Sequence, residues 1–146
     1  MTDPSSPPCF VLGIETQIGV GVVRELGRAG VRVVGLASRP RSIGLASRYL
    51  ERGIVVGPAR DAALVRRVRE LGDEYGGAIL PGISETDLEW LLAHPGEFGR
   101  VAPVTPPPAA FRPVPATAQT LALAAPLRPR VPTPQAPLTL QARRPG

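Results

Sequence analysis

The sequence predicts an α/β domain built as a three-layer, doubly wound parallel sheet of four to five strands. Short apolar runs alternate with longer stretches of helical periodicity over residues 9–104, and the connections between them are short. This alternation is typical of parallel strands joined by crossover helices. The pattern is clearest over residues 9–37, so the domain is organised around that unit.

The first unit indicates a strand, a turn, a helix and a second strand. An apolar run at residues 9–12 precedes a polar turn at 14–17. Apolar side chains at helical spacing follow over residues 18–26, with charged residues on the opposite face. Gly30 stands where a helix end favours a left-handed residue, and the β-branched run at 31–36 predicts the second strand.

The rest of the domain repeats the alternation. The expected elements are one helical turn in residues 45–50, a third strand at 54–56, a helix after Asp61, a fourth strand at 78–81, a helix after Ser84 that ends at 94–96, and a short fifth strand at 101–104. Asp61 and Ser84 are residue types that cap helix N-termini. Trp90 alternates with leucines, which predicts a packing role, and Cys9 is expected in the core.

Charged residues and prolines are distributed unevenly along the chain. Residues 98–146 contain 6 of the 17 basic residues and none of the 12 acidic ones, and 12 of the 19 prolines follow residue 102. We therefore expect a disordered leader at residues 1–8, the domain at 9–104, and a largely disordered Pro/Arg-rich tail at 105–146. Because the basic balance comes from the tail, no nucleic-acid partner is expected.

Location and assembly are less constrained. No apolar stretch approaches the ~20 residues of a membrane span, and the N-terminus lacks the pattern of a signal peptide. We therefore expect a cytoplasmic protein with no membrane partner, and the oligomeric state stays open.

Candidate ligand-binding residues follow the strands at the carboxyl edge of the predicted sheet, where ligands of such folds bind. They are Glu15, Thr16, Gln17, Gly19, Ser38, Arg39, Ser84 and Glu85. Two alternatives stay open: Gly19 and Gly21 only let the helix approach the sheet, and Ser84 with its following acids only caps a helix. The glycine spacing is not that of a dinucleotide fingerprint, although Arg39 with Arg41 fits a 2′-phosphate. No catalytic residue and no metal site is predicted.

Several of these segments resemble the N-terminal domain of ATP-grasp ligases, in particular bacterial carboxylate–amine ligases. The matching segments are Thr16-Gln17-x-Gly19, Arg24-Glu25-Leu26-Gly27-Arg28, Ser47-Arg48-Tyr49 and Ser84-Glu85-x-Asp87-Leu88, in that order within residues 9–104. The resemblance implies a Rossmann-like pre-ATP-grasp domain that shapes the substrate side. In complete family members, ATP with Mg²⁺ activates a carboxylate as an acyl phosphate, which an amine then attacks.

The resemblance continues in altered form beyond the domain. Residues 118–125 and 131–134 are similar to family segments, but Ala116-Thr117 stand where an Asp-Lys pair is expected, and the sequence stops at Gly146 before the ATP-binding core. It therefore implies a truncated domain that is inactive alone, with no cofactor in this chain. ATP, Mg²⁺ and a small-molecule carboxylate substrate are implied for a complete member.

Two other functions stay open. One is a free-standing Rossmann-like binder of a nucleotide or NADP. The other is a non-enzymatic interaction module that uses the basic, Pro-rich tail.

Overall fold

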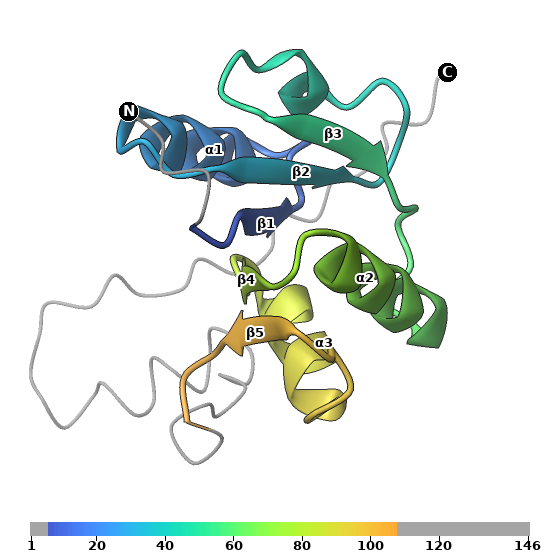
Figure 1. Ribbon diagram of the computed structural model, residues 1–146. Helices are drawn as coiled ribbons and strands as arrows, with labels where there is room; N and C mark the ends of the chain where they lie inside the picture. Colours follow the sequence, from blue (N-terminus) through green and yellow to red (C-terminus); the bar gives the residue numbers. More distant parts are fainter. Residues whose placement is uncertain (1–5, 108–146) are drawn as a thin grey trace, which may run out of the picture. The chain divides into compact units, whose positions relative to one another are not determined.

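The computed structural model describes residues 6–107, which form a five-stranded parallel sheet with helices on both faces (Figure 1). The elements are β1 (Cys9–Leu12), α1 (Gln17–Arg28), β2 (Val33–Ala37), the 3₁₀ turn η1 (Ile43–Ala46), β3 (Arg52–Val55), α2 (Ala62–Glu74), β4 (Ala78–Pro81), α3 (Glu85–Ala93) and β5 (Val101–Val104). The predicted α/β fold class is therefore confirmed. The predicted tail at 105–146 and leader at 1–8 lie mostly outside the described residues.

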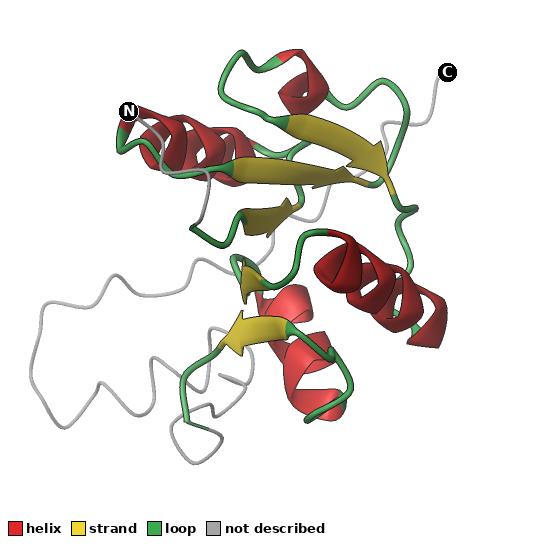
Figure 2. Cartoon of the chain, viewed as in Figure 1, coloured by secondary structure: helices red, strands yellow, loops and turns green. Residues whose placement is uncertain are grey.

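The strand order places a switch point beside β1. The sheet runs β3-β2-β1-β4-β5, and every neighbouring pair is parallel. The chain moves outward from β1 to β3 and then returns to β4 on the other side of β1, so the loops after β1 and β4 diverge at the carboxyl edge (Figure 2). Ligands of open α/β sheets bind in the crevice at such a point.

Two apolar clusters, one on each face of the sheet, form the core. Phe10 and Leu12 of β1 pack with residues of α2 and α3, whereas Cys9 and Val11 pack with the α1 side. This alternation follows from the period of two in a strand, and all four residues of β1 are buried. A central strand with both faces covered needs the continuous apolar run that the sequence shows at residues 9–12.

The predicted core positions of Trp90 and Cys9 are confirmed. Trp90 is buried and packs edge-on against Phe98, with ring centroids 5.0 Å apart. Cys9 is also buried in the core. Asp61 and Ser84 cap α2 and α3, as their residue types predict.

Three element positions differ from the prediction. β2 begins at Val33 rather than residue 31, because the Val31 N–H donates to the Leu26 carbonyl at 3.0 Å and closes the end of α1. β3 starts at Arg52 rather than residue 54, because its backbone pairs with β2 from Val34 onward even though Arg52 and Gly53 are exposed. The helical turn lies at Ile43–Ala46 rather than 45–50, because the Gly44 N–H donates to the Ile14 carbonyl at 3.0 Å and ties the turn to the end of β1. Backbone contacts with distant residues therefore place β3 and the helical turn earlier in the chain than the local apolar pattern predicts.

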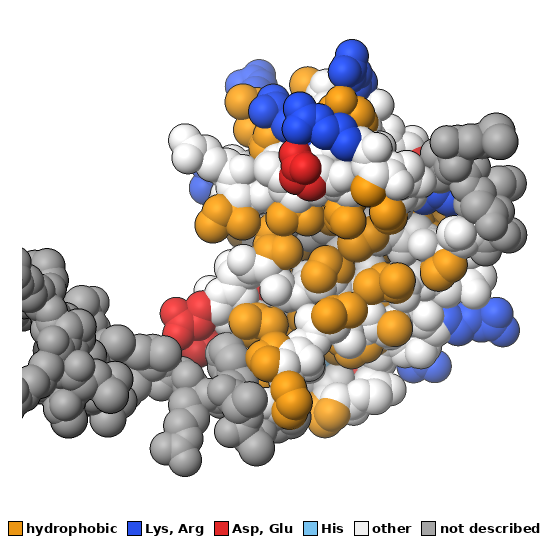
Figure 3. Space-filling view, turned by 90° about the vertical axis from the view of Figure 1, so that its left-hand side faces the viewer, with side chains coloured by type: hydrophobic (Ala, Val, Ile, Leu, Met, Phe, Trp, Pro, Cys, Tyr) orange, Lys and Arg blue, Asp and Glu red, His pale blue; other side chains and the backbone are white. Residues whose placement is uncertain are grey.

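The α1 side of the sheet is less fully covered over β4 and β5. Ile79 is 39% exposed and Val104 is 54% exposed. Figure 3 shows hydrophobic side chains gathered across one side of the described part. Within residues 6–107, no helix has the length and apolarity to cross a membrane, since the longest has 13 residues.

Candidate functional site

Residues that follow β1, β2, β3 and β4 surround two adjoining hollows at the carboxyl edge. The β2-side hollow, of about 620 Å³, is lined by Ser38, Arg39 and Arg41 among others. The β4-side hollow, of about 300 Å³, is lined by Thr16, Ser84 and Asp87 among others. Glu15, Pro58 and Arg60 line both, so the hollows meet at these residues. Their sizes suit a small molecule.

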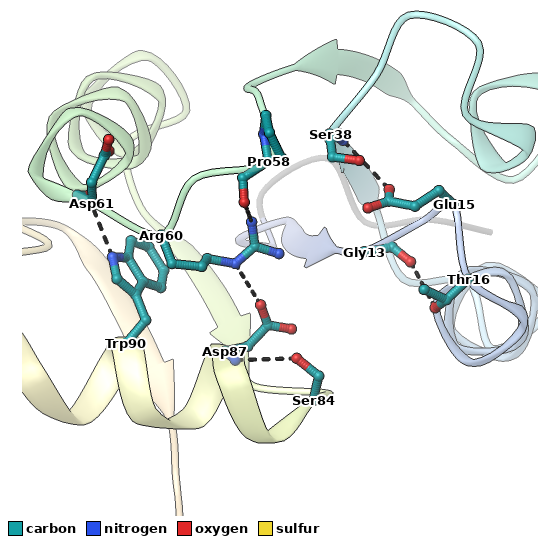
Figure 4. A network of polar contacts seen from close by, with 10 residues as sticks. All are labelled: Gly13, Glu15, Thr16, Ser38, Pro58, Arg60, Asp61, Ser84, Asp87 and Trp90. Carbon is teal, nitrogen blue, oxygen red and sulfur yellow. Dashed lines mark hydrogen bonds and ion pairs between the residues drawn. The ribbon is translucent and has the colours of Figure 1, made fainter.

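Arg60 is fixed at the centre of this site by a buried carboxylate. Its Nε donates to Asp87 Oδ1 at 2.7 Å, and its Nη1 donates to the Pro58 carbonyl at 3.4 Å. The Asp87 side chain is only 2% exposed and that of Arg60 is 16% exposed. Figure 4 shows the remaining guanidinium nitrogen directed toward Gly13 and Glu15. Arg60 therefore presents hydrogen-bond donors to the site, while the ion pair with Asp87 holds its guanidinium in place.

The start of α3 determines where Asp87 lies. Ser84 Oγ accepts the backbone N–H of Asp87 at 3.1 Å, and Asp87 is the third residue of the helix, where the helix dipole favours a negative charge. Trp90 Nε1 donates to the Asp61 carbonyl at 3.4 Å and so ties α3 to the start of α2. Because Arg60 directly precedes Asp61, these contacts bring the two charges together (Figure 4).

Glu15 lies across the site and joins the ends of β1 and β2. Its Oε2 accepts the backbone N–H of Ser38 at 3.4 Å. Partial burial acts to raise the pKa of Glu15, but the hydrogen bonds from Ser38 and the charge of Arg60 outweigh it and hold the pKa below its usual value. Glu15 is therefore a carboxylate at neutral pH.

A residue of the turn between β1 and α1 caps the N-terminus of α1. Thr16 Oγ1 accepts the Gly19 N–H at 3.0 Å and donates to the Gly13 carbonyl at 2.8 Å. Gly19 is buried, and a Cβ at this position would lie 2.2 Å from the Gly13 oxygen. A glycine is therefore required here for helix α1 to approach the strand end.

The structure brings together most, but not all, of the predicted site residues. Five of the eight line the two hollows: Glu15, Thr16, Ser38, Arg39 and Ser84. Gln17 is exposed and lines a further hollow along α1, which shares Glu15 and Thr16 with the β4-side hollow. Gly19 lies under the turn, and Glu85 is exposed and lines none of these hollows.

Sequence reasoning missed Arg60. It occurs in the loop after β3, two residues beyond Pro58, in no recognisable motif. The available signal was its position after a strand of the same sheet, because that places it at the edge where the other candidates lie. Within residues 6–107, no three His, Cys, Asp or Glu side chains gather as a metal site.

The fold and this edge define the described residues as a Rossmann-like α/β domain. No protein-family model matches the chain, and no curated protein matches it either. Among solved structures, the chain is similar to F189W actinorhodin polyketide ketoreductase with NADPH, at 24% identity and a TM-score of 0.45. That match covers 56% of this chain and 34% of the ketoreductase chain, so it spans about a third of that protein.

Proposed function

We propose that residues 9–104 are the substrate-side domain of an ATP-grasp carboxylate–amine ligase, and that the site around Arg60 binds the carboxylate of its small-molecule substrate. The observation that carries this proposal is the Arg60 guanidinium, anchored to buried Asp87 and open toward Glu15. The segments that resemble the ligase family support the class of enzyme.

The charges of the two hollows favour an anionic ligand. Arg39, Arg41 and Arg60 line them, against the carboxylates of Glu15 and Asp87. Asp87 is already engaged by Arg60, and Glu15 accepts the Ser38 N–H. A guanidinium has five N–H donors in a planar fork, and a carboxylate matches two of them at once. The donors that Arg60 leaves unused are therefore suited to a carboxylate ligand.

Glu15 adds selectivity for the rest of the ligand. Its carboxylate lies across the site from Arg60, so it attracts an ammonium or hydroxyl group of the same molecule. The ligand class that fits is a small molecule with a carboxylate at one end and a hydrogen-bond donor nearby. In a complete ligase, ATP with Mg²⁺ supplies the activation, and these residues hold and orient the carboxylate-bearing molecule.

Thermal-shift and calorimetric titrations with small carboxylates test the proposal. Each amino acid or dicarboxylate is paired with its amide, which has the same shape without the charge. Carboxylates should raise the Tm and the amides should not, since a ligand at 100 times its Kd adds about 2.7 kcal/mol of stability.

The matched variants are Arg60→Gln/Asp87→Asn, which removes both charges and keeps the shapes, and Arg66→Gln, which removes an exposed arginine of α2. The first should abolish the shift and the second should leave it unchanged. Equal binding of carboxylates and amides, or full binding by the double variant, contradicts the proposal.

A second candidate is an NADP-binding domain. Arg39 and Arg41 follow β2 and line one hollow, where a 2′-phosphate of NADP fits a basic pair. It ranks second because Thr16 already occupies the Gly19 N–H at the start of α1, where a pyrophosphate would need donors. A thermal shift with NADP that NAD does not give, and that Arg39→Gln removes, would favour this candidate.

A further inference from the structure

A second concave surface lies along the flank of α1. One hollow of about 400 Å³ includes Gly21, and a neighbouring hollow of about 480 Å³ includes Arg48 and Tyr49. Both are lined by Val20, Arg24 and Ile43, so they form one continuous surface between α1 and η1. We call it the flank groove. Arg60 lines neither hollow.

The flank groove collects positive charge. Arg24 and Arg28 lie one helical turn apart on α1, and Arg48 comes from the segment after η1. Arg28 pairs with Glu25 at 2.7 Å, but Arg24 and Arg48 form no ion pair within the described residues. The hollow that contains the three arginines is lined by no acidic residue, whereas Glu15 lines the neighbouring hollow that contains Gly21. A bound anion would therefore interact with the guanidiniums of Arg24 and Arg48, with which no carboxylate of the described residues pairs.

Tyr49 holds two of these guanidiniums in place. The Arg48 guanidinium lies over the Tyr49 ring, 5.0 Å from its centroid, and its Nη2 donates to the hydroxyl at 3.0 Å. Hydrogen bonds from Arg48 and Arg28 hold the pKa of Tyr49 below its usual value. A Cβ on Gly27 would lie 2.5 Å from Tyr49 Cβ, so this glycine lets the tyrosine pack against α1. Pre-ordered donors lose less entropy when they bind a ligand.

Gly21 leaves room beside Arg24. It is inside α1, where glycine is unfavourable, yet a Cβ there would meet no atom within 4 Å. Gly19 and Gly27 differ, since packing accounts for both. Gly21 lies on the same stripe of the helix as Arg24 and Arg28. Gly21 therefore leaves open space beside Arg24, where a ligand has room to approach the backbone.

We propose that the flank groove binds the phosphoryl group of a small phosphorylated molecule, with Arg24 and Arg48 as the main donors and Gly21 providing the space beside them. Guanidiniums from two separate segments match the several oxygens and the double charge of a phosphate monoester better than those of a single carboxylate. Val20 and Ile43 form an apolar floor for the organic part, and Ile43 is 71% exposed. This site does not include Arg60, but it adjoins the carboxylate site, because Glu15 and Thr16 line hollows of both.

Titration of the ¹⁵N-labelled full chain with inorganic pyrophosphate at constant ionic strength tests the proposal. Saturable shifts should appear at the Gly21 amide and at the Nε signals of Arg24 and Arg48. Arg24→Gln/Arg48→Gln should weaken binding at least tenfold, whereas Arg66→Gln and Arg60→Gln/Asp87→Asn should leave the affinity unchanged.

Gly21→Leu separates a binding role from a structural one. Leucine favours helix and meets no neighbour at Cβ, so the Tm should rise, while its side chain fills the space beside Arg24 and lowers pyrophosphate affinity at least fivefold. Absence of saturable shifts, shifts confined to Arg39 and Arg60, equal loss in Arg66→Gln, or unchanged affinity in Gly21→Leu would each overturn the proposal.

Discussion

Replacing Arg60 with methionine should destabilise the domain by about 3–5 kcal/mol, because it leaves the Asp87 carboxylate buried without a partner. Methionine keeps the length and much of the volume of the arginine stem, so packing changes little. The Asp87 side chain is 2% exposed, so water does not replace the arginine as its partner while the local structure is kept. The loss of stability in Arg60→Met therefore measures the effect of removing the positive charge rather than a change in packing.

The geometry supports this magnitude. At the 2.7 Å separation of Arg60 Nε and Asp87 Oδ1, two unit charges attract by about 6 kcal/mol at an effective dielectric constant of about 20. Desolvation of both ions offsets most of that attraction in the intact pair. Removing only Arg60 ends the attraction but keeps the desolvation cost of Asp87. Removing both charges ends both, so Arg60→Met/Asp87→Asn should be more stable than Arg60→Met alone.

Urea unfolding followed by Trp90 fluorescence provides the assay. Trp90 is the only tryptophan of the chain and contacts the Asp61 carbonyl beside Arg60, so it reports on this part of the fold. A double-mutant cycle over Arg60 and Asp87 should give a coupling of about 2–3 kcal/mol, near the upper end for neighbouring residues. A loss below about 1 kcal/mol for Arg60→Met, or a double variant no more stable than it, would refute the view that the pair is buried and coupled.

Three further predictions concern single residues. Gly19→Ala should lower the free energy of unfolding by at least about 1 kcal/mol despite better helix propensity, because the new Cβ meets the Gly13 oxygen; an unchanged Tm would contradict this. The lowered pKa of Glu15 contributes stability that is present above its ordinary value of 4.5 and is lost as pH falls through the folded pKa. Glu15→Gln should therefore lose stability at pH 7 and converge with the parent chain in acid, as pH-dependent urea unfolding would show; a constant difference would contradict it. Burial raises the pKa of Cys9 from 9.0 to about 11, so its thiolate fraction is about 100-fold lower, and the native protein should react slowly with a disulfide reagent until it unfolds.

Local patterns were enough to predict most of the fold. The apolar runs at residues 9–12, 78–81 and 101–104 became β1, β4 and β5 without displacement, because every residue of these strands is apolar. The caps at Asp61 and Ser84 depend on contacts two or three residues away, which residue type alone reveals. β3 was harder, since its first two residues, Arg52 and Gly53, are not part of the apolar run and its start follows from pairing with β2.

The candidate site was only half predictable, and the reason is sequence separation. Polar residues directly after β1, β2 and β4 could be assigned to one edge from topology. The Arg60–Asp87 contact joins residues 27 apart, in a loop and a helix whose packing depends on Trp90. The different roles of Gly19 and Gly21 likewise depend on where the Gly13 carbonyl points, which no local pattern shows.

The two anchored carboxylates explain how five short strands make a defined site. The contact between Glu15 and Ser38 joins the ends of β1 and β2, and the pair of Arg60 with Asp87 joins the loop after β3 to α3. The first contact lies within one half of the sheet, whereas the second crosses from the β3 side of β1 to the β4 side, and the hollows lie at the switch point between the two halves. A ligand that reaches both Arg60 and Glu15 therefore connects the two contacts. Binding should protect the backbone amides at the ends of β1 and β4 from hydrogen exchange together, whereas a ligand held in the flank groove should protect α1 and the segment from η1 to Tyr49.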